Sequence, residues 1–506
     1  MKRLLLLIAA TLLGCYAGAA QDEYSESCTS IMVGRRASVD GSVITSHTCD
    51  GKYRTWMTIE PAADHAEGEM HIVRKGTMKT SFRDDTTGVT VVGEIPEVSH
   101  TYAYLNTAYP CLNEHQLAIG ETTFVGPRTL VNKDAMFLIE ELERIALQRC
   151  TTAREAVLLM GRTAEKYGYG DTGECLTVAD RNEVWQFEIV GVGKENVGAA
   201  WVAQRIPDDC IGVSANIPRI GKLHREDPAN FLCSDNLEKV AKANGLWDGK
   251  GEFIFWKHLG SDGRAKNYAD REFYIYSMLA PSQGFTREMD ELPVYVKPDD
   301  KVNVRQVMDL FRATYEGTDL DMCKNVKIDS VKISPVANPW LTTTMRNTLN
   351  AIAPGTVEFH RTVSVAWCAY SFVAQLRNWL PDTVGGVCWI AVDNPAQSPR
   401  IPVFSGNTEL PAAFNYCGQK HYWPDCLLWT FRRANKLATL SWQSTRKGFM
   451  QNVMKAEEMA FSGLGSLENN PTPEAVNRYT EHVFERSSQI WKEMENEYWV
   501  MFGSGF

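Results

Sequence analysis

Two short β-prone segments near the N-terminus constrain the fold of this chain more than any other feature. Residues 28–34 and 42–46 are rich in apolar and β-branched side chains, and Asp40-Gly41 stands between them. Because an Asp-Gly pair accepts the positive φ angles of a tight turn, the pattern predicts a β-hairpin. Its second strand runs on into a polar end, from His47 to Asp50.

The N-terminus has the three parts of a secretory signal peptide, placed at residues 1–20. Lys2 and Arg3 are positively charged, residues 4–13 are apolar, and residues 17–20 are small, as cleavage requires. The apolar part is too short to span a membrane, and no later run approaches the roughly 18 apolar residues of a span. We therefore expect an exported product, periplasmic or secreted. Residues 12–15 loosely resemble a lipoprotein box, which leaves a transient lipid-anchored form through Cys15 as an alternative.

An acidic segment, residues 21–27, separates the signal from Cys28 and has no packing pattern, as expected of a propeptide. Its removal would make Cys28 the first residue of the mature chain. An N-terminal cysteine carries its own general base, since an α-amino group has a pKa of about 7.7–8.0 and can take the thiol proton. The alternative is that Cys28 is a buried strand cysteine, which is common for this residue type.

Composition narrows the function classes. The net charge is −10 and there are no long Lys/Arg runs, which argues against nucleic acid as a partner. The 13 cysteines include no C-x-x-C pair and no Cys/His cluster at zinc spacing. The hypothesis therefore contains no metal and no organic cofactor, and most cysteines are expected to be small buried hydrophobes.

The middle of the chain predicts helices followed by meandering strands. Apolar residues repeat at helical spacing over residues 133–149, and a second helix, capped by Thr151 or Thr152, is expected to end near Tyr167. A helix pair followed by antiparallel strands is typical of an α+β layered sandwich and not of βαβ units. The strands are expected at residues 174–179, 184–190, 201–206 and 211–215.

Further elements complete a domain whose predicted boundaries are residues 28 and 461. Residues 362–369 and 387–392 are apolar enough for central strands, and a helix is expected between them at residues 372–379. After a linker, Thr472-Pro473 begins a C-terminal helix over residues 472–506. The apolar stripe of this helix is expected to pack on the core. A share of the stripe in the contacts of a homo-oligomer is the alternative.

Five groups of residues recur in a recognisable order between Cys28 and about Phe404. They are Cys28-Thr29-Ser30-Ile31 with Asp40-Gly41-Ser42, Asn113-Glu114-His115, residues 201–209, residues 271–282, and residues 370–387. Together they resemble the cysteine dipeptidases of the N-terminal-nucleophile hydrolase superfamily, the group that includes the secernins.

The resemblance implies a four-layer αββα sandwich, a propeptide cut immediately before Cys28, and hydrolysis of dipeptides or short peptides. It makes Asp50 the residue that binds the α-amino group of the nucleophile. It gives Asn216 a place in the oxyanion hole through its side-chain amide. A prepositioned donor of this kind is worth roughly 3–4 kcal/mol when charge develops on the carbonyl oxygen.

The remaining site residues also come from the resemblance. Arg271 lies where the family has an arginine near the active site, with a surface salt-bridge arginine as the alternative. Glu121 and Thr122 are expected to line the substrate cleft. His47 stands where relatives have an arginine, three residues before Asp50. Because an imidazole offers fewer donors than a guanidinium, His47 is expected to contact substrate, to titrate with the nucleophile, or to be structural.

The hypothesis is an exported cysteine peptidase that acts on small peptides through an N-terminal Cys28. One alternative keeps the mechanism but changes the substrate to a non-peptide amide, as in bile-salt hydrolase or penicillin V acylase, because pocket shape and not fold decides the substrate. A second alternative, motivated by His47, is an inactive secreted binding protein on the same scaffold. A papain-type Cys/His enzyme has no supporting local signature.

Overall fold

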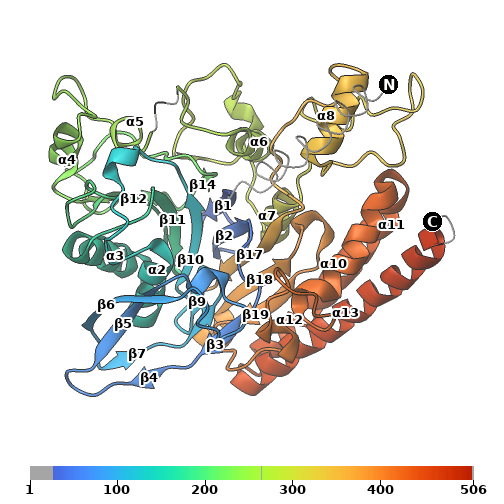
Figure 1. The fold of residues 1–506 in the computed structure, drawn as a ribbon. Helices are drawn as coiled ribbons and strands as arrows, with labels where there is room; N and C mark the ends of the chain where they lie inside the picture. Colours follow the sequence, from blue (N-terminus) through green and yellow to red (C-terminus); the bar gives the residue numbers. More distant parts are fainter. Residues whose placement is uncertain (1–26, 262, 264, 504–506) are drawn as a thin grey trace, which may run out of the picture.

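Two large antiparallel sheets lie face to face in the centre of the molecule, with helices on both outer sides (Figure 1). The structure is a computed structural model, which describes residues 27–261, 263 and 265–503. The signal peptide and residues 21–26 of the expected propeptide lie outside the described residues. The α+β class expected from the sequence is confirmed.

The first sheet has seven strands and carries the predicted hairpin near its middle. The Asp40-Gly41 turn is present, and Gly41 takes a φ of 86°. In spatial order the strands are β16 (Tyr295–Val296), β14 (Ile211–Ser214), β1 (Ser27–Val33), β2 (Val43–Asp50), β17 (Cys368–Leu376), β18 (Gly386–Val392) and β19 (Ile401–Phe404).

The second sheet has eight strands and contains the first three strands of the predicted meander, at residues 174–179, 184–190 and 201–206. The fourth strand, expected at residues 211–215, lies in the first sheet beside β1, so the predicted hairpin between residues 201–206 and 211–215 is wrong. Two small two-stranded sheets, β4 (Ala63–Asp64) with β7 (His100–Thr101) and β5 (Met70–Lys75) with β6 (Thr90–Pro96), lie at one end of the second sheet. In spatial order its strands are β15 (Phe231–Cys233), β13 (Ala200–Ile206), β12 (Val184–Val190), β11 (Glu174–Ala179), β10 (Ala118–Thr123), β9 (Leu112–Asn113), β8 (Tyr104–Asn106) and β3 (Thr58–Glu60).

Helices cover the outer faces of the two sheets. Among them, α2 and α3 pack on the second sheet, and α10 and α13 pack beside β18 and β19 of the first. The helices are α2 (Ile139–Arg149), α3 (Ala153–Tyr167), α4 (Leu237–Ala243), α5 (Phe255–His258), α6 (Asp270–Leu279), α7 (Val304–Phe311), α8 (Thr343–Ile352), α9 (Asp382–Gly385), α10 (Leu427–Ala438), α11 (Trp442–Ser462), α12 (Leu464–Glu468) and α13 (Pro473–Gly503).

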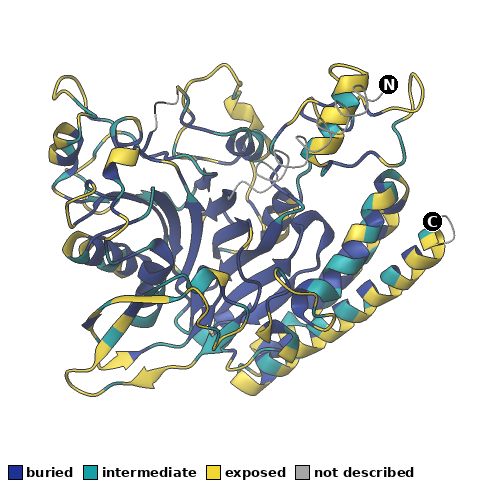
Figure 2. Cartoon of the chain, in the orientation of Figure 1, coloured by how far each residue is buried: buried dark blue, intermediate teal, exposed yellow. Residues whose placement is uncertain are grey.

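The two sheets approach closely where β2 crosses β10 and β11. The Thr45 hydroxyl donates to the carbonyl oxygen of Thr177 at 3.0 Å. Gly120 is required at this contact, since a Cβ there would lie 2.3 Å from the carbonyl oxygen of Ser46. Strands β2 and β11 are buried along their whole length and β10 up to Thr122, and Figure 2 shows this core in dark blue.

Two helical predictions need correction. Helix α2 begins at Ile139 and not near residue 133, because Phe137 pairs its backbone with Gly168 and Gly170 instead. The predicted helix at residues 372–379 is wrong, since this segment continues β17, which lies hydrogen-bonded between β2 and β18. A fully buried strand has no polar face, so its sequence pattern cannot be told from a buried helix. Most of the strand expected at residues 362–369 is likewise irregular.

Other predictions are confirmed. Thr152 caps α3 with a full capping box. Thr472 accepts the Ala475 backbone N–H at the start of α13, which packs against α10 and α11. The twelve cysteines of the described residues form no disulfide, and eleven of them are buried. Contacts in a homo-oligomer stay a prediction.

Residues 316–360 leave the sheet pair and form what we call the outer lobe. It contains α8 and has a small hydrophobic cluster of its own, made by Met322, Cys323, Val326, Ala337, Leu341 and Val357. In Figure 1 the lobe stands apart from the sheets, beyond α7. No helix among the described residues has both the length and the apolar character needed to cross a membrane.

Candidate active site

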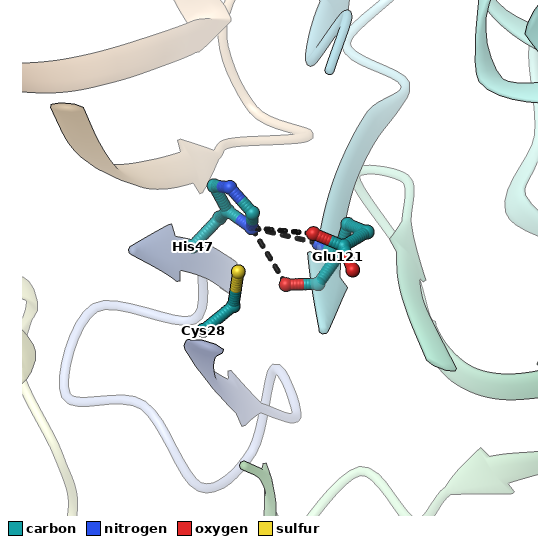
Figure 3. A group of neighbouring side chains, drawn as sticks. All are labelled: Cys28, His47 and Glu121. Atoms are coloured by element: carbon teal, nitrogen blue, oxygen red, sulfur yellow. Dashed lines mark hydrogen bonds and ion pairs between the residues drawn. The ribbon is translucent and has the colours of Figure 1, made fainter. Parts of the chain in front are cut away.

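Cys28 is the second residue of β1 and faces the space between the two sheets (Figure 3). Its Cα partner across the hairpin is Cys49, and β14 lies on the other side of β1. Only 1% of Cys28 is exposed. Burial, followed by the nearby Glu121, raises the pKa of the Cys28 thiol well above its ordinary value. As an internal residue of the chain, Cys28 is therefore a neutral thiol.

Polar groups gather around the backbone of Cys28. Its N–H donates to the side-chain oxygen of Asn216 at 2.7 Å. Arg271, from α6, donates through Nη2 to the same oxygen at 2.8 Å and through Nη1 to the carbonyl oxygen of Cys28. Asn216 follows β14 with a left-handed φ of 65°, a conformation that asparagine tolerates better than most residues. The structure thus places three predicted site residues in direct contact.

Asp50 ends β2 beside this cluster. Its Oδ2 accepts hydrogen bonds from the Thr48 hydroxyl at 3.0 Å and from Arg361 Nη2 at 2.6 Å. Its Oδ1 is buried and has no hydrogen-bond partner among the described residues. Arg361 also donates to the Ser27 hydroxyl at 2.7 Å. Nothing in the sequence indicated Arg361, which belongs to no motif and lies far from Asp50 along the chain.

His47 joins the two sheets and does not act as a substitute guanidinium. Its Nδ1 lies 3.0 Å from the backbone nitrogen of Glu121 and 2.6 Å from the carbonyl oxygen of Glu121. Burial lowers the pKa of His47 to about 4. The neutral ring therefore accepts from one of these groups or donates to the other. Tyr109, Tyr370 and Phe372 surround it.

Glu121 is an acidic group next to the Cys28 thiol. Its side chain is fully buried, has a carboxyl oxygen within 4.8 Å of the Cys28 sulfur, and accepts from the Thr123 hydroxyl at 2.9 Å. Burial raises the pKa of Glu121 and also that of Glu174, a hydrogen-bonded neighbour on β11. Two carboxyl groups in one buried site hold a proton between them. Glu174 was missed because one glutamate at a strand start gives no signal in the sequence.

Two threonines adjacent to Glu121 differ in their surroundings. The Thr122 hydroxyl meets that of Ser214 at 2.6 Å, so this side chain bridges the two sheets. The Thr123 carbonyl oxygen accepts a hydrogen bond from Asn216 Nδ2 at 2.6 Å. The backbone of Thr123 therefore touches the site, whereas Thr122 lies behind it.

Cys28, His47 and Glu121 also form the one group of the described residues whose ligand atoms, all within 4.8 Å of one another, could hold a metal ion. Figure 3 shows that the Nδ1 side of His47 faces Glu121. A metal bound through Nδ1 would displace the hydrogen bond between His47 and the Glu121 backbone.

The arrangement combines a buried thiol, an amide and a guanidinium at the nucleophile's backbone, and a carboxylate with one open oxygen. These groups suit attack on an amide carbonyl more than redox or phosphoryl chemistry.

Comparisons with known proteins agree with this chemistry. The chain is 27% identical over 414 residues to a "Probable dipeptidase" from Latilactobacillus sakei, covering 78% of this chain and 77% of that one. It is 26% identical over 455 residues to a "Probable dipeptidase" from Salmonella dublin, covering 86% and 90%. It is 23% identical over 425 residues to "Probable dipeptidase B" from Streptococcus pyogenes serotype M1, covering 79% and 77%.

A family description extends over almost the whole described chain. Residues 27–455 match the pattern of "Peptidase family C69". The match begins one residue before Cys28 and includes every site residue described above. The chain therefore belongs to peptidase family C69 and is a cysteine-type dipeptidase.

Proposed function

We propose that the chain is cut between Ser27 and Cys28 and that the new α-amine makes Cys28 the nucleophile. One observation carries this proposal: the buried polar groups surround the backbone nitrogen of Cys28, which lies 2.7 Å from the Asn216 oxygen. His47 is a poor base because burial lowers its pKa to about 4. A free α-amine, with a pKa of about 7.7–8.0, is a far better acceptor for the thiol proton.

The reaction then follows from these positions. The α-amine of Cys28 takes the proton from its own Sγ, and the thiolate attacks the peptide carbonyl carbon. The tetrahedral intermediate collapses as the amine returns this proton to the leaving nitrogen, which breaks the C–N bond and leaves a thioester. Water, deprotonated by the same amine, then attacks the thioester and releases the acid and the thiol.

Asn216 and Asp50 have separate roles in this scheme. The Asn216 Nδ2 group gives one hydrogen to the Thr123 carbonyl oxygen at 2.6 Å, so its second hydrogen can meet the developing oxyanion. The open Oδ1 of Asp50 receives the α-ammonium after proton transfer. Arg271 keeps the strand end rigid by holding the carbonyl oxygen of Cys28.

Glu121 supplies the recognition of the substrate amine in this proposal. A dipeptide carries an α-ammonium group on the residue that is acylated, and Glu121 lies beside the Cys28 thiol. His47 fixes the backbone of Glu121 at 3.0 Å, and Thr122 anchors the same strand to Ser214. These two residues act through Glu121. A non-peptide amide without an ammonium group would leave this buried carboxyl pair without a counterion, which favours the dipeptide over an acylase substrate.

The cellular context belongs to the same proposal. Residues 1–20 direct export to the periplasm or the medium, residues 21–27 form the propeptide, and the sheet pair with its two helical layers is the four-layer sandwich of N-terminal-nucleophile hydrolases. Retention of the chemical groups around Cys28 argues against an inactive binding protein.

Intact mass and N-terminal sequencing of the secreted protein test the proposal. We expect the wild type to begin at Cys28 and Cys28→Ala to keep residues 21–27 if the cut is autocatalytic. Cys49→Ala is the matched control, because Cys49 is an equally buried cysteine directly across the hairpin. An active wild type that still carries Ser27 would contradict the proposal.

A further inference from the structure

Arg361 connects the nucleophile's surroundings to the outer surface. Its Nη2 donates to the Ser27 hydroxyl at 2.7 Å and to Asp50 Oδ2 at 2.6 Å, and its Nε lies 3.2 Å from the same hydroxyl. The Asp50 side chain is fully buried, whereas 18% of the Arg361 side chain is exposed. The guanidinium is therefore within reach of a ligand that enters from solvent.

We propose that Arg361 binds the C-terminal carboxylate of the dipeptide substrate. The inference rests on the proposed function, because the cut before Cys28 removes Ser27 together with its hydroxyl. Nη2 has two hydrogens, and Asp50 needs only one of them. The Nε and Nη2 hydrogens that meet Ser27 then form an open fork, which matches the two oxygens of a carboxylate.

The charges around the site favour an anion at this position. Arg271 and Arg361 interact with each other and with Asp50, so two cations flank one carboxylate. A substrate ammonium is repelled here and is directed to the buried carboxyl groups of Glu121 and Glu174. A dipeptide carries opposite charges at its two ends, and the site offers the complementary charge on each side of Cys28.

The outer lobe limits the length of the ligand. Arg361 lines a cavity of only about 10 Å³ together with Trp340, Phe359 and Trp367. Such a space has no room for a further residue beyond the bound carboxylate. The aromatic walls also exclude water from one side of the guanidinium, which strengthens its pairing with a carboxylate. We therefore expect dipeptides to be preferred over longer chains.

Steady-state kinetics with three substrates test the assignment: L-Ala-L-Ala, its C-terminal amide, and L-Glu-L-Ala. We expect the wild type to prefer the free carboxylate over the amide by about 10- to 100-fold in kcat/KM, as for a hydrogen bond between charged groups. Arg361→Gln should reduce that ratio to about threefold or less, and Arg361→Lys should keep part of it. Arg346→Gln is the matched control, because Arg346 lines the same cavity but stacks on Phe359.

The outcomes separate the explanations. If Arg361 only orients Asp50, Arg361→Gln lowers kcat/KM for all three substrates by one factor and leaves the carboxylate-to-amide ratio unchanged, which overturns the assignment. If Arg361 binds an acidic side chain instead, Arg361→Gln lowers kcat/KM for L-Glu-L-Ala alone and leaves the carboxylate-to-amide ratio unchanged, which also overturns the assignment. A wild type that hydrolyses L-Ala-L-Ala with Ser27 still attached overturns both this inference and the proposed function.

Discussion

The side-chain oxygen of Asn216 accepts the backbone N–H of Cys28 at 2.7 Å, although 188 positions separate the two residues. Asn216 also donates through Nδ2 to the Thr123 carbonyl oxygen. One side chain thus fixes the nucleophile's nitrogen and points an amide group towards the neighbouring sheet.

Asn216→Asp separates these two duties, since it keeps the acceptor and removes the Nδ2 donor. We expect kcat to fall by about 100- to 1,000-fold, as for the loss of one oxyanion donor. Asn216→Gly should lose at least as much while accepting the φ of 65° without strain. Activity assays on correctly processed protein measure kcat for both variants. If kcat of Asn216→Asp is within tenfold of the wild-type value, the Nδ2 group is not an oxyanion donor and Asn216 only positions Cys28.

His47 gives a prediction for the pH dependence of stability. Its pKa is about 4 in the folded protein, against an ordinary 6.5. The unfolded state therefore takes up a proton below pH 6.5 that the folded state refuses, and folding loses about 2 kcal/mol between pH 7.5 and pH 5. In His47→Gln this part of the loss should vanish. Urea denaturation at both pH values measures this change in the free energy of unfolding. An equal change between the two pH values in the wild type and in His47→Gln would show that the folded protein accommodates a protonated His47, which contradicts the prediction.

Glu140, in the first turn of α2, is expected to affect the pH dependence of stability in the opposite direction to His47. It is fully buried, neither carboxyl oxygen has a hydrogen-bond partner among the described residues, and burial raises its pKa from 4.5 to about 8. The unfolded state loses the proton near pH 4.5, so folding loses stability as the pH rises towards 8. Glu140→Gln should therefore stabilise the protein by about 3 kcal/mol at pH 7 and by nothing at pH 4.

Glu141 is the matched control for that change. It is also buried in α2, but it accepts a hydrogen bond from His71 at 2.8 Å. Glu141→Gln should lower the free energy of unfolding at pH 7. Stabilisation by both substitutions would mean that general charge reduction, and not the missing partners of Glu140, is responsible.

Gly120 gives a prediction about the packing of the two sheets. Gly120→Ala places a methyl group 2.3 Å from the Ser46 carbonyl oxygen, and neither strand can move without breaking its ladder. We expect a loss of more than about 3 kcal/mol, or no soluble protein. Gly448→Ala, in the middle of α11 with no atom close to the new methyl group, should stabilise by up to about 1 kcal/mol. Thermal unfolding compares the two variants, and similar melting temperatures would contradict the close approach.

Local patterns predicted the elements whose signals are local. The hairpin came from an Asp-Gly turn, and α3 from its capping threonine and helical apolar spacing. The start of α2 was placed too early, because the competing backbone contact of Phe137 with residues 168–170 is not visible in a sequence window.

The site residues also fall into those that local motifs predict and those that only the folded chain brings together. Cys28, Asp50 and Asn216 were predicted together because they stand at strand ends within recognisable motifs, and the structure places them close to one another. Arg361 is 311 residues from Asp50, and its neighbours have no periodicity, so only the folded chain brings the two together. The partnership of Glu174 with Glu121 depends on the pairing of β10 with β11, which a sequence leaves open.

The position of β1 between β2 and β14 has a consequence for the life of the enzyme. A chain end ordinarily frays, yet Cys28, the end of the mature chain under the proposed cut, is in a strand held on both sides by neighbouring strands. The contacts around the backbone of Cys28 come from α6 and from the segment after β14, so they form only after the chain has folded through about residue 279. Under the proposed cut before Cys28, removal of the propeptide would therefore report that this part of the fold is complete.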